Sequence, residues 1–210
     1  MRHLAIYGAG GAGRGVMPLL RAAARPGDTL YFIDDGEAGR EINGHRALAF
    51  AEFAALAGEK RAALAVADAD TRRALADRCA DAGVSFLEVR AESVVEMDDV
   101  RLGEGAILSP FVVLTSNIRI GRHFHANLYS CVEHDCVIGD FVTFAPSVRC
   151  NGAVTIGDGA YVGANAVIRQ GLSIGAGATV GMGAVVTRDV PAGETWVGNP
   201  ARRLDRSGGG

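Results

Sequence analysis

The stretch VTIGDGAYVGANAVIRQGLSIGAGATVGMGAVV, residues 154–186, carries an apolar residue at every sixth position, and the same step runs without a slip through residues 94–189. All fifteen positions of this register are apolar: Leu102, Leu108, Leu114, Ile120, Ala126, Val132, Ile138, Phe144, Cys150, Ile156, Val162, Ile168, Ile174, Val180 and Val186. A second register lies two residues earlier in each repeat, and Ser130 is its one polar member: Val100, Ala106, Val112, Ile118, Phe124, Ser130, Cys136, Val142, Val148, Val154, Ala160, Ala166, Leu172, Ala178 and Ala184.

A period of six fits neither an α-helix, which repeats every 3.6 residues, nor the simple alternation of a half-buried strand. A unit of six residues cannot bury its apolar face alone, so it must stack on its neighbours. The repeat therefore predicts a parallel β-helix in which three repeats make one coil. Residues eighteen apart then lie above one another, separated by roughly 4.8 Å, the spacing of neighbouring strands.

Turn-forming residues predict where the coil bends. Pro110 and Pro146 lie two residues after an inward position, and Asn117 and Asn165 lie three after, so the corners fall at these two offsets. Stepping by eighteen separates the first offset into three edges with different chemistry. An apolar edge reads Pro110, Leu128, Pro146, Ala164 and Met182; a charged edge reads Glu104, Arg122, Asp140, Asp158 and Ala176; the third reads Ser116, His134, Gly152, Gln170 and Arg188. The fold does not need an exposed apolar edge, which favours a contact surface for another subunit or a ligand.

The first ninety residues have a different pattern, in which strands alternate with helices. We expect strands over 3–7, 29–33, 62–67 and 85–89, and helices from the glycine-rich segment to about residue 24, over 49–57 and over 70–82. Pro18 must lie in the first turns of its helix or kink it. This order predicts a small parallel sheet with right-handed crossovers. The chain thus divides into a small Rossmann-like α/β domain, residues 1–92, a β-helix, residues 93–190, and a C-terminal tail, residues 191–210.

The segment Gly8-Ala9-Gly10-Gly11-Ala12-Gly13 follows a predicted strand and precedes a predicted helix. Such a loop lets backbone N–H groups approach a phosphate at a helix N-terminus. The pair Asp34-Asp35 lies where a dinucleotide-binding domain would hold a ribose, which is compatible with NAD. Ninety residues have room for only half of a dinucleotide fold, so a mononucleotide, such as that of a nucleotide-sugar, fits better. The alternative is a glycine turn that only packs a helix closely.

Composition and charge exclude several classes of function. A net charge of -3 gives no electrostatic support for binding nucleic acid or an anionic membrane. The four cysteines do not form a secreted disulfide pattern, and two of them occupy inward positions of the coil, which favours reduced thiols in the cytoplasm. There is no run of eighteen apolar residues, so we expect neither a membrane span nor a signal peptide. The end Ser207-Gly208-Gly209-Gly210 is expected to be disordered.

His134 is the candidate catalytic residue because it lies on a corner, outside the packed interior, between Glu133 and Asp135. A neighbouring carboxylate can hold one imidazole nitrogen and leave the other to accept a proton. The alternative is an ordinary surface histidine beside acids, which is how we interpret His123 and His125. A zinc site of Cys131, His134 and Cys136 is rejected because Cys136 points inward and the spacing matches no familiar site. No metal is implied.

The repeats Ile138-Gly139-Asp140, Ile156-Gly157-Asp158-Gly159 and Val162-Gly163-Ala164-Asn165, and the tail 191–202 (PAGETWVGNPAR), resemble the hexapeptide acyltransferases, whose fold is a left-handed parallel β-helix. The whole chain resembles their sialic acid O-acetyltransferase-like branch, which includes bacterial N-acetyltransferases of nucleotide-linked 4-amino-sugars. Three segments carry this likeness: residues 7–13 (YGAGGAG), 32–35 (FIDD) and 132–139 (VEHDCVIG).

The resemblance implies a homotrimer with acetyl-CoA lying along the coil between subunits and a nucleotide-linked amino-sugar held by the N-terminal domain. His134 matches the family's catalytic base and Asp135 the acid that tunes it. Matching substrate-binding positions are Gly10, Gly11, Ala12, Asp34, Asp35 and Ala67, and matching acetyl-CoA positions are Thr143, Ala164 and Met182. Ala12 and Thr143 stand where many members have histidine, and residues 65–70 replace a more usual segment with Gly and Asn.

These features predict direct acetyl transfer from acetyl-CoA to the amine of a nucleotide-linked 4-amino-4,6-dideoxy sugar, with His134 as general base. No cysteine or serine lies beside His134 as an evident nucleophile, so no acyl-enzyme is required. Two alternatives remain open: acetylation of a sugar hydroxyl with the same base and donor, and a non-catalytic trimeric scaffold whose N-terminal domain senses a nucleotide.

Overall fold

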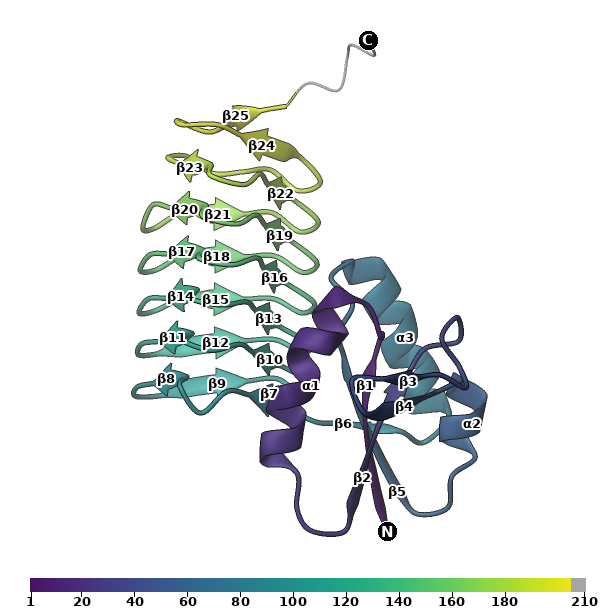
Figure 1. Ribbon diagram of the computed structural model, residues 1–210. Coiled ribbons are helices and arrows are strands. Elements are labelled where there is room, and N and C mark those ends of the chain that lie inside the picture. Colours follow the sequence, from purple (N-terminus) through teal and green to yellow (C-terminus); the bar gives the residue numbers. More distant parts are fainter. Residues whose placement is uncertain (205–210) are drawn as a thin grey trace. The chain divides into compact units, whose positions relative to one another are not determined.

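The computed structural model describes residues 1–204, which form two compact units (Figure 1). The first unit consists of Met1–Arg90 together with Glu104–Ile107, and the second of Ala91–Gly103 and the described chain from Leu108 onward. Residues 207–210, for which we expect disorder, lie outside the described residues.

The first unit is built on a six-stranded sheet with the order β3-β4-β2-β1-β5-β6. All of its pairs are parallel except β3 with β4. Figure 1 shows α1 on one face of the sheet and α2 and α3 on the other, as right-handed crossovers require. Its elements are β1 (Arg2–Tyr7), α1 (Gly11–Ala23), β2 (Asp28–Ile33), β3 (Glu41–Ile42), β4 (His45–Leu48), α2 (Phe50–Ala54), β5 (Glu59–Leu64), α3 (Ala69–Asp81) and β6 (Ser85–Phe86).

The expected strands and helices of this unit are present with shifted ends, but the strand expected over 85–89 is divided: Ser85–Phe86 forms β6, and Val89 begins β7 (Val89–Arg90) in another sheet. Two further differences concern Pro18 and a hairpin. Pro18 lies in the interior of α1, beyond the first turns, and the helix continues to Ala23. The hairpin of β3 and β4 was not predicted. Its turn is Asn43-Gly44, and both residues have positive φ, 50° and 79°. Asn-Gly is a strong hairpin signal because both central positions of a type I′ turn require this conformation.

The second unit forms a left-handed parallel β-helix with three sheets, as predicted, and the first of these sheets also includes β7 and Ile107 from the first unit. Face 1 contains β7 (Val89–Arg90), β10 (Ile107–Leu108), β13 (His125–Ala126), β16 (Thr143–Phe144), β19 (Tyr161–Val162), β22 (Thr179–Val180), β24 (Thr195–Val197) and β25 (Arg202–Arg203). Face 2 contains β8 (Val95–Glu96), β11 (Val113–Leu114), β14 (Cys131–Val132), β17 (Arg149–Cys150), β20 (Val167–Ile168) and β23 (Val185–Val186). Face 3 contains β9 (Val100–Leu102), β12 (Ile118–Ile120), β15 (Val137–Ile138), β18 (Thr155–Ile156) and β21 (Ser173–Ile174).

The pairing of strands confirms the step of eighteen: Val113 pairs with Cys131, and Cys131 pairs with Arg149. Both apolar registers are buried from Ala106 and Leu108 upward, and they form one continuous core. Each inward side chain therefore packs against its counterparts in the coils above and below. The energy of the fold resides in this stacking, since no single repeat encloses a core of its own.

The corners also lie at the predicted offsets. From Gly105 to Gly183, the residue three places after each inward position has positive φ. Several of these residues are large, which is costly because a side chain in this conformation crowds its own backbone. They stack in pairs one coil apart: the rings of Phe111 and Tyr129 are 5.0 Å apart and nearly parallel, as are those of His123 and Phe141. Aromatic stacking offsets part of the backbone cost.

The interpretation of His123 and His125 as surface residues was wrong. His123 is fully buried and His125 is 7% exposed. The His123 ring stacks on Phe141 of the next coil, and Phe141 is itself buried, so this edge of the coil is enclosed, whereas the equally stacked Phe111 and Tyr129 are each 52% exposed.

Candidate active site

The glycine-rich segment connects β1 to α1 and opens the helix without a side-chain cap. Gly10 is the N-cap residue, and Gly10, Gly11 and Ala12 are all exposed. Gly13 has a packing role, because a Cβ there would lie 1.8 Å from the carbonyl oxygen of Gly8. The segment thus combines a close helix-to-strand approach with exposed backbone at a helix N-terminus, the arrangement that binds phosphate in dinucleotide and mononucleotide folds.

The acidic pair after β2 holds this edge of the sheet together. The Asp34 carboxylate accepts hydrogen bonds from the Ala9 N–H at 2.9 Å and the Gly36 N–H at 3.1 Å. Asp35 accepts from the Phe50 N–H at 2.8 Å and from Arg78 at 2.9 Å, and these bonds lower the pKa of Asp35. Asp34 therefore fixes the glycine segment, and Asp35 ties the strand end to α2 and α3.

A buried arginine shapes the third loop of this edge. Arg72 in α3 is fully buried, and its guanidinium donates to the carbonyl oxygens of Val66, at 2.6 Å, and Ala67, at 3.0 Å. Burial lowers the pKa of Arg72 to about 10, so the side chain remains charged at neutral pH. Ala67 itself is exposed. The loop carbonyls are thus held by a cation from inside the unit.

The structure brings the six predicted substrate-binding residues to one edge. They lie in the loops that follow β1, β2 and β5 and in the first turn of α1, and these three strands are neighbours in the order β2-β1-β5. Ligands of open α/β sheets bind outside the carboxyl ends of the strands, where successive connections leave in opposite directions. Here α1 follows β1 on one face and α3 follows β5 on the other, so the six residues surround such a point (Figure 1).

In the β-helix, His134 and Asp135 form the corner between faces 2 and 3. The imidazole Nδ1 is 2.8 Å from the Asp135 Oδ2, and both side chains are more than half exposed. The hydrogen bond to Asp135 raises the pKa of His134 above its ordinary value, and the pKa of Asp135 is lowered for the same reason. An ionised Asp135 accepts from Nδ1–H, which leaves Nε2 as the basic nitrogen of the neutral ring.

Two residues beside this pair were missed as parts of the site. Asn117, one coil below Asp135, donates its amide to Asp135 Oδ1 at 3.1 Å. Gly152, one coil above His134, has no side chain where the imidazole lies. Both could have been found by stepping eighteen residues from the pair, because that step brings adjacent coils into contact.

The predicted acetyl-CoA positions differ in exposure. Met182 is 82% exposed and Ala164 is half-buried, and both lie on the apolar edge between faces 1 and 2. Thr143 lies on face 1 in β16 and is only 3% exposed. The apolar edge is therefore accessible, with Leu128 and Pro146 also exposed on it.

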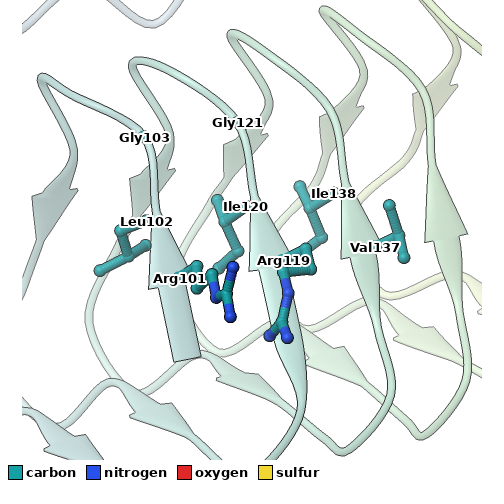
Figure 2. A pocket seen from close by; sticks show the side chains of 8 residues that line it. All are labelled: Arg101, Leu102, Gly103, Arg119, Ile120, Gly121, Val137 and Ile138. Carbon is teal, nitrogen blue, oxygen red and sulfur yellow. The ribbon is translucent and has the colours of Figure 1, made fainter. Parts of the chain in front are cut away.

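Faces 2 and 3 each carry a shallow hollow. On face 2 a hollow of about 300 Å³ extends from the stacked pair Phe111 and Tyr129 to Glu133, the residue before His134. On face 3 a hollow of about 290 Å³ lies beside Arg101 and Arg119, whose side chains come from adjacent coils (Figure 2). Arg119 is tied to the Asp99 carboxylate at 2.6 Å. The face 2 hollow is thus the one that reaches the corner of His134.

Within residues 1–204, no group of three or more His, Cys, Asp or Glu side chains is arranged to hold a metal ion. The four cysteines are free thiols. No helix in the described part of the chain is long and apolar enough to span a membrane.

Comparisons with known proteins agree with this architecture. A family described as the hexapeptide repeat of succinyl-transferase matches residues 153–188. GDP-perosamine N-acetyltransferase from Escherichia coli O157:H7 is 45% identical over 99% of this chain and 98% of its own length. The structure of WeeI from Acinetobacter baumannii AYE is similar with a TM-score of 0.95 and 48% identity, covering 97% of this chain and all of that one.

The structure of PerB from Caulobacter crescentus, in complex with CoA and GDP-perosamine, has a TM-score of 0.90 and 30% identity, and covers 97% of each chain. These similarities extend over both units of the chain. The 45% identity to the Escherichia coli relative is also far higher than a shared fold alone requires. The chain is therefore an acyltransferase that belongs to the hexapeptide-repeat family, in the group that contains the GDP-perosamine N-acetyltransferases.

Proposed function

We propose that this chain transfers the acetyl group of acetyl-CoA directly to the amine of a nucleotide-linked 4-amino-4,6-dideoxy sugar, with His134 as general base. The observation that carries the proposal is the His134–Asp135 pair, an exposed imidazole whose Nδ1 is held 2.8 Å from a carboxylate. The likeness to a GDP-perosamine N-acetyltransferase over the whole chain makes GDP-perosamine the first acceptor to test.

In this mechanism the acceptor amine attacks the thioester carbonyl while His134 Nε2 accepts a proton from it. Asp135 keeps the proton of the neutral imidazole on Nδ1, so that Nε2 faces the reacting amine. A backbone N–H near the corner stabilises the oxyanion, and collapse of the tetrahedral intermediate expels the CoA thiol. Transfer is direct in this mechanism, since the residues on either side of His134 are carboxylates and the nearby Cys136 thiol is buried in the core.

We assign the two ligands to different parts of the chain. Residues 1–92 bind the nucleotide-sugar through Gly10, Gly11, Ala12, Asp34, Asp35 and Ala67. Residues 93–190 bind acetyl-CoA along the apolar edge, where Ala164 and Met182 supply contacts and Thr143 lies nearby on face 1. Residues 191–204 close the coil as its C-terminal tail, since β24 continues the sheet of face 1 and β25 pairs with it. Asp34 acts mainly by fixing the glycine segment, because its carboxylate is already bonded to Ala9 and Gly36.

We propose further that the active molecule is a homotrimer in which face 2 contacts other copies. The outward positions of this face are apolar with one exception: Val95, Val113, Cys131, Arg149, Val167 and Val185. Those of face 3 are mostly polar: Arg101, Arg119, Val137, Thr155 and Ser173. Face 2 joins the apolar edge to the corner of His134, so its burial between copies brings one copy's base to the next copy's apolar edge.

The test is CoA thiol release from acetyl-CoA with a panel of GDP-, UDP- and dTDP-linked 4-amino-sugars, followed by mass and NMR analysis of the product. We expect an amide on the 4-amino group and a rate that His134→Ala lowers by roughly 10²–10⁴-fold, the range of general-base catalysis. Acetyl-CoA affinity of the variant should remain near that of the unchanged chain.

Near-normal turnover by a folded His134→Ala variant would overturn the role of the base. An ester on a sugar hydroxyl, with the amine unmodified, would assign the chain to O-acetylation instead. Nucleotide binding with no thiol release over the whole panel would favour the scaffold alternative.

A further inference from the structure

The third residue of the His134 site lies on the coil below it. The Asp135 carboxylate divides its two oxygens between two partners: Oδ2 faces His134 Nδ1 at 2.8 Å, and Oδ1 accepts from the Asn117 amide at 3.1 Å. The carboxylate accepts in both bonds, so the Asn117 amide group must be the donor. Three side chains from two adjacent coils therefore form one hydrogen-bonded chain, Asn117–Asp135–His134.

Building on the proposed role of His134 as base, we propose that Asn117 is a positioning residue, which fixes the plane of the Asp135 carboxylate and thereby the tautomer and orientation of the imidazole. The terminal torsion of an aspartate is broad, so a carboxylate with one partner can turn about it. A second partner on the other oxygen restricts that rotation. Asn117 thus acts on the imidazole only through Asp135.

The backbone of the corner holds the chain of three in register. Asn117 and Asp135 lie one coil apart with nearly equal positive φ, 59° and 61°. The Asp135 N–H donates to the Ser116 carbonyl at 3.0 Å, and the His134 carbonyl accepts from the Ala153 N–H at 2.8 Å. The pair is therefore clamped from below and above, and the Asn117 amide starts from a backbone that cannot drift relative to Asp135.

Asparagine meets two requirements at this position. It tolerates positive φ better than other residues with a side chain, and it supplies a neutral donor. Glycine would meet only the first requirement and aspartate would replace the donor with a second negative charge. The two substitutions therefore separate the donor from the backbone.

The experiment follows the pKa of His134 by NMR titration of its imidazole Cε1–H, together with the pH profile of kcat/KM, in the full-length chain. The other groups that act on His134 are Glu133 and Cys136, which remain unchanged throughout. For Asn117→Gly we expect a lower His134 pKa, an acidic limb displaced to lower pH and a loss of about 3–10-fold in kcat, with KM for acetyl-CoA unchanged. For Asn117→Asp we expect the opposite displacement, because a second carboxylate favours the charged imidazole.

Asn165→Gly is the matched control for backbone effects. Asn165 is also a corner asparagine with positive φ, 58°, on another edge of the coil. Its replacement should change the Tm as much as Asn117→Gly does and leave the His134 pKa in place.

Unchanged His134 pKa values in both Asn117 variants would overturn the inference and leave Asn117 as an ordinary corner residue. Opposite displacements of the pKa without any effect on turnover would support the positioning of the imidazole and contradict the general-base role. The two failures are thus distinguishable, because the titration reports on Asn117 and turnover reports on His134.

Discussion

The His134 imidazole occupies the space that a side chain at Gly152 would need. A Cβ built on Gly152 would lie 2.4 Å from His134 Cε1 and 2.5 Å from its Nε2. Gly152 lies on the coil directly above, so the ring rests against backbone. Gly152 is not among the glycines with positive φ, and the three atoms nearest to its Cβ position all belong to the imidazole, so the ring is the main obstacle to a side chain there.

Replacing Gly152 with alanine should therefore move the imidazole without unfolding the coil. The nearest atoms are the end of an exposed side chain that can swing aside, so we expect a Tm within a few degrees of the unchanged chain. Turnover should fall by about 10–100-fold, because displacing a catalytic group by about 1 Å has that order of effect. Steady-state kinetics and a thermal melt of the same preparation measure both quantities.

Gly157→Ala serves as the contrast. A Cβ on Gly157 would lie 2.5 Å from the backbone N of Ala176. All three of its nearest atoms belong to Ala176, and none belongs to His134. We expect this variant to lose stability and to retain turnover per folded molecule. A Gly152→Ala variant that melts early and keeps its turnover would show that Gly152 serves the coil and has no bearing on the imidazole.

The raised pKa of His134 predicts the pH dependence of the reaction. A general base must be neutral, so kcat/KM should fall as the pH drops through the pKa of His134, and the hydrogen bond to Asp135 places that limb above the ordinary 6.5. Asp135→Asn removes the charge that favours the imidazolium. The limb should then move to lower pH while the plateau rate falls, because an asparagine no longer holds Nδ1–H selectively.

The His134–Asp135 pair should also make the stability of the fold depend on pH, with less stability at higher pH. A histidine whose pKa is raised on folding contributes stability that is fully present below its unfolded pKa and is lost as the pH rises through the folded pKa. Because both side chains are exposed, solvent screens the pair and the effect on unfolding should be small. If the acidic limb of kcat/KM did not move in the Asp135→Asn variant, that result would contradict the coupling of His134 to Asp135.

Asp34 offers a test of the glycine segment. Its carboxylate accepts from two backbone N–H groups, and Asn at this position retains one acceptor oxygen. We expect Asp34→Asn to raise KM for the nucleotide-sugar by about tenfold, through loosening of residues 8–13, and to leave KM for acetyl-CoA unchanged. The matched control is Glu37→Gln, which removes only the exposed ion pair with Arg40 and should alter neither constant. Equal changes in both KM values would contradict the assignment.

The β-helix could be derived from sequence in detail because its rule is strictly periodic. One step of six places every inward residue, and one step of eighteen places every neighbour in the next coil, as the pairing of Val113 with Cys131 confirms. The aromatic stacks were not predicted, because turn propensities describe single positions and not the contacts between coils. Turn propensities favour small and polar residues at positive φ, and only pairwise contact between coils explains why Phe111 and Tyr129 can adopt it.

The site was less predictable, because the step of eighteen places Asn117 below Asp135 and Gly152 above His134 but does not show what either residue does there. His134 and Asp135 are adjacent in sequence, so their pairing could be expected. Asn117 and Gly152 contribute through a hydrogen bond and an absent side chain, and neither leaves a local motif. The structural use of Asp34, bonded to Ala9 across twenty-five residues, likewise depends on how two strand ends meet.

The proposed contact between copies through face 2 predicts different outcomes for the same charge on two faces. Val167 points outward from face 2 and Thr155 points outward from face 3. If face 2 is buried between copies, a glutamate at Val167 would place an unpaired carboxylate in an apolar contact, which costs several kcal/mol per copy. A glutamate at Thr155 would remain in water. We therefore expect sedimentation to give a monomer for Val167→Glu and a trimer for Thr155→Glu.

Catalysis should follow assembly, because in the proposed arrangement each base works against the apolar edge of the adjacent copy. Val167→Glu should thus lose turnover although Val167 is no part of the reacting group, and turnover should return as the concentration of the variant drives reassociation. Retention of full specific activity by a monomeric Val167→Glu variant would show that one copy contains a complete site. A trimer that withstands the glutamate at Val167 but dissociates with glutamate at Thr155 would move the interface to face 3.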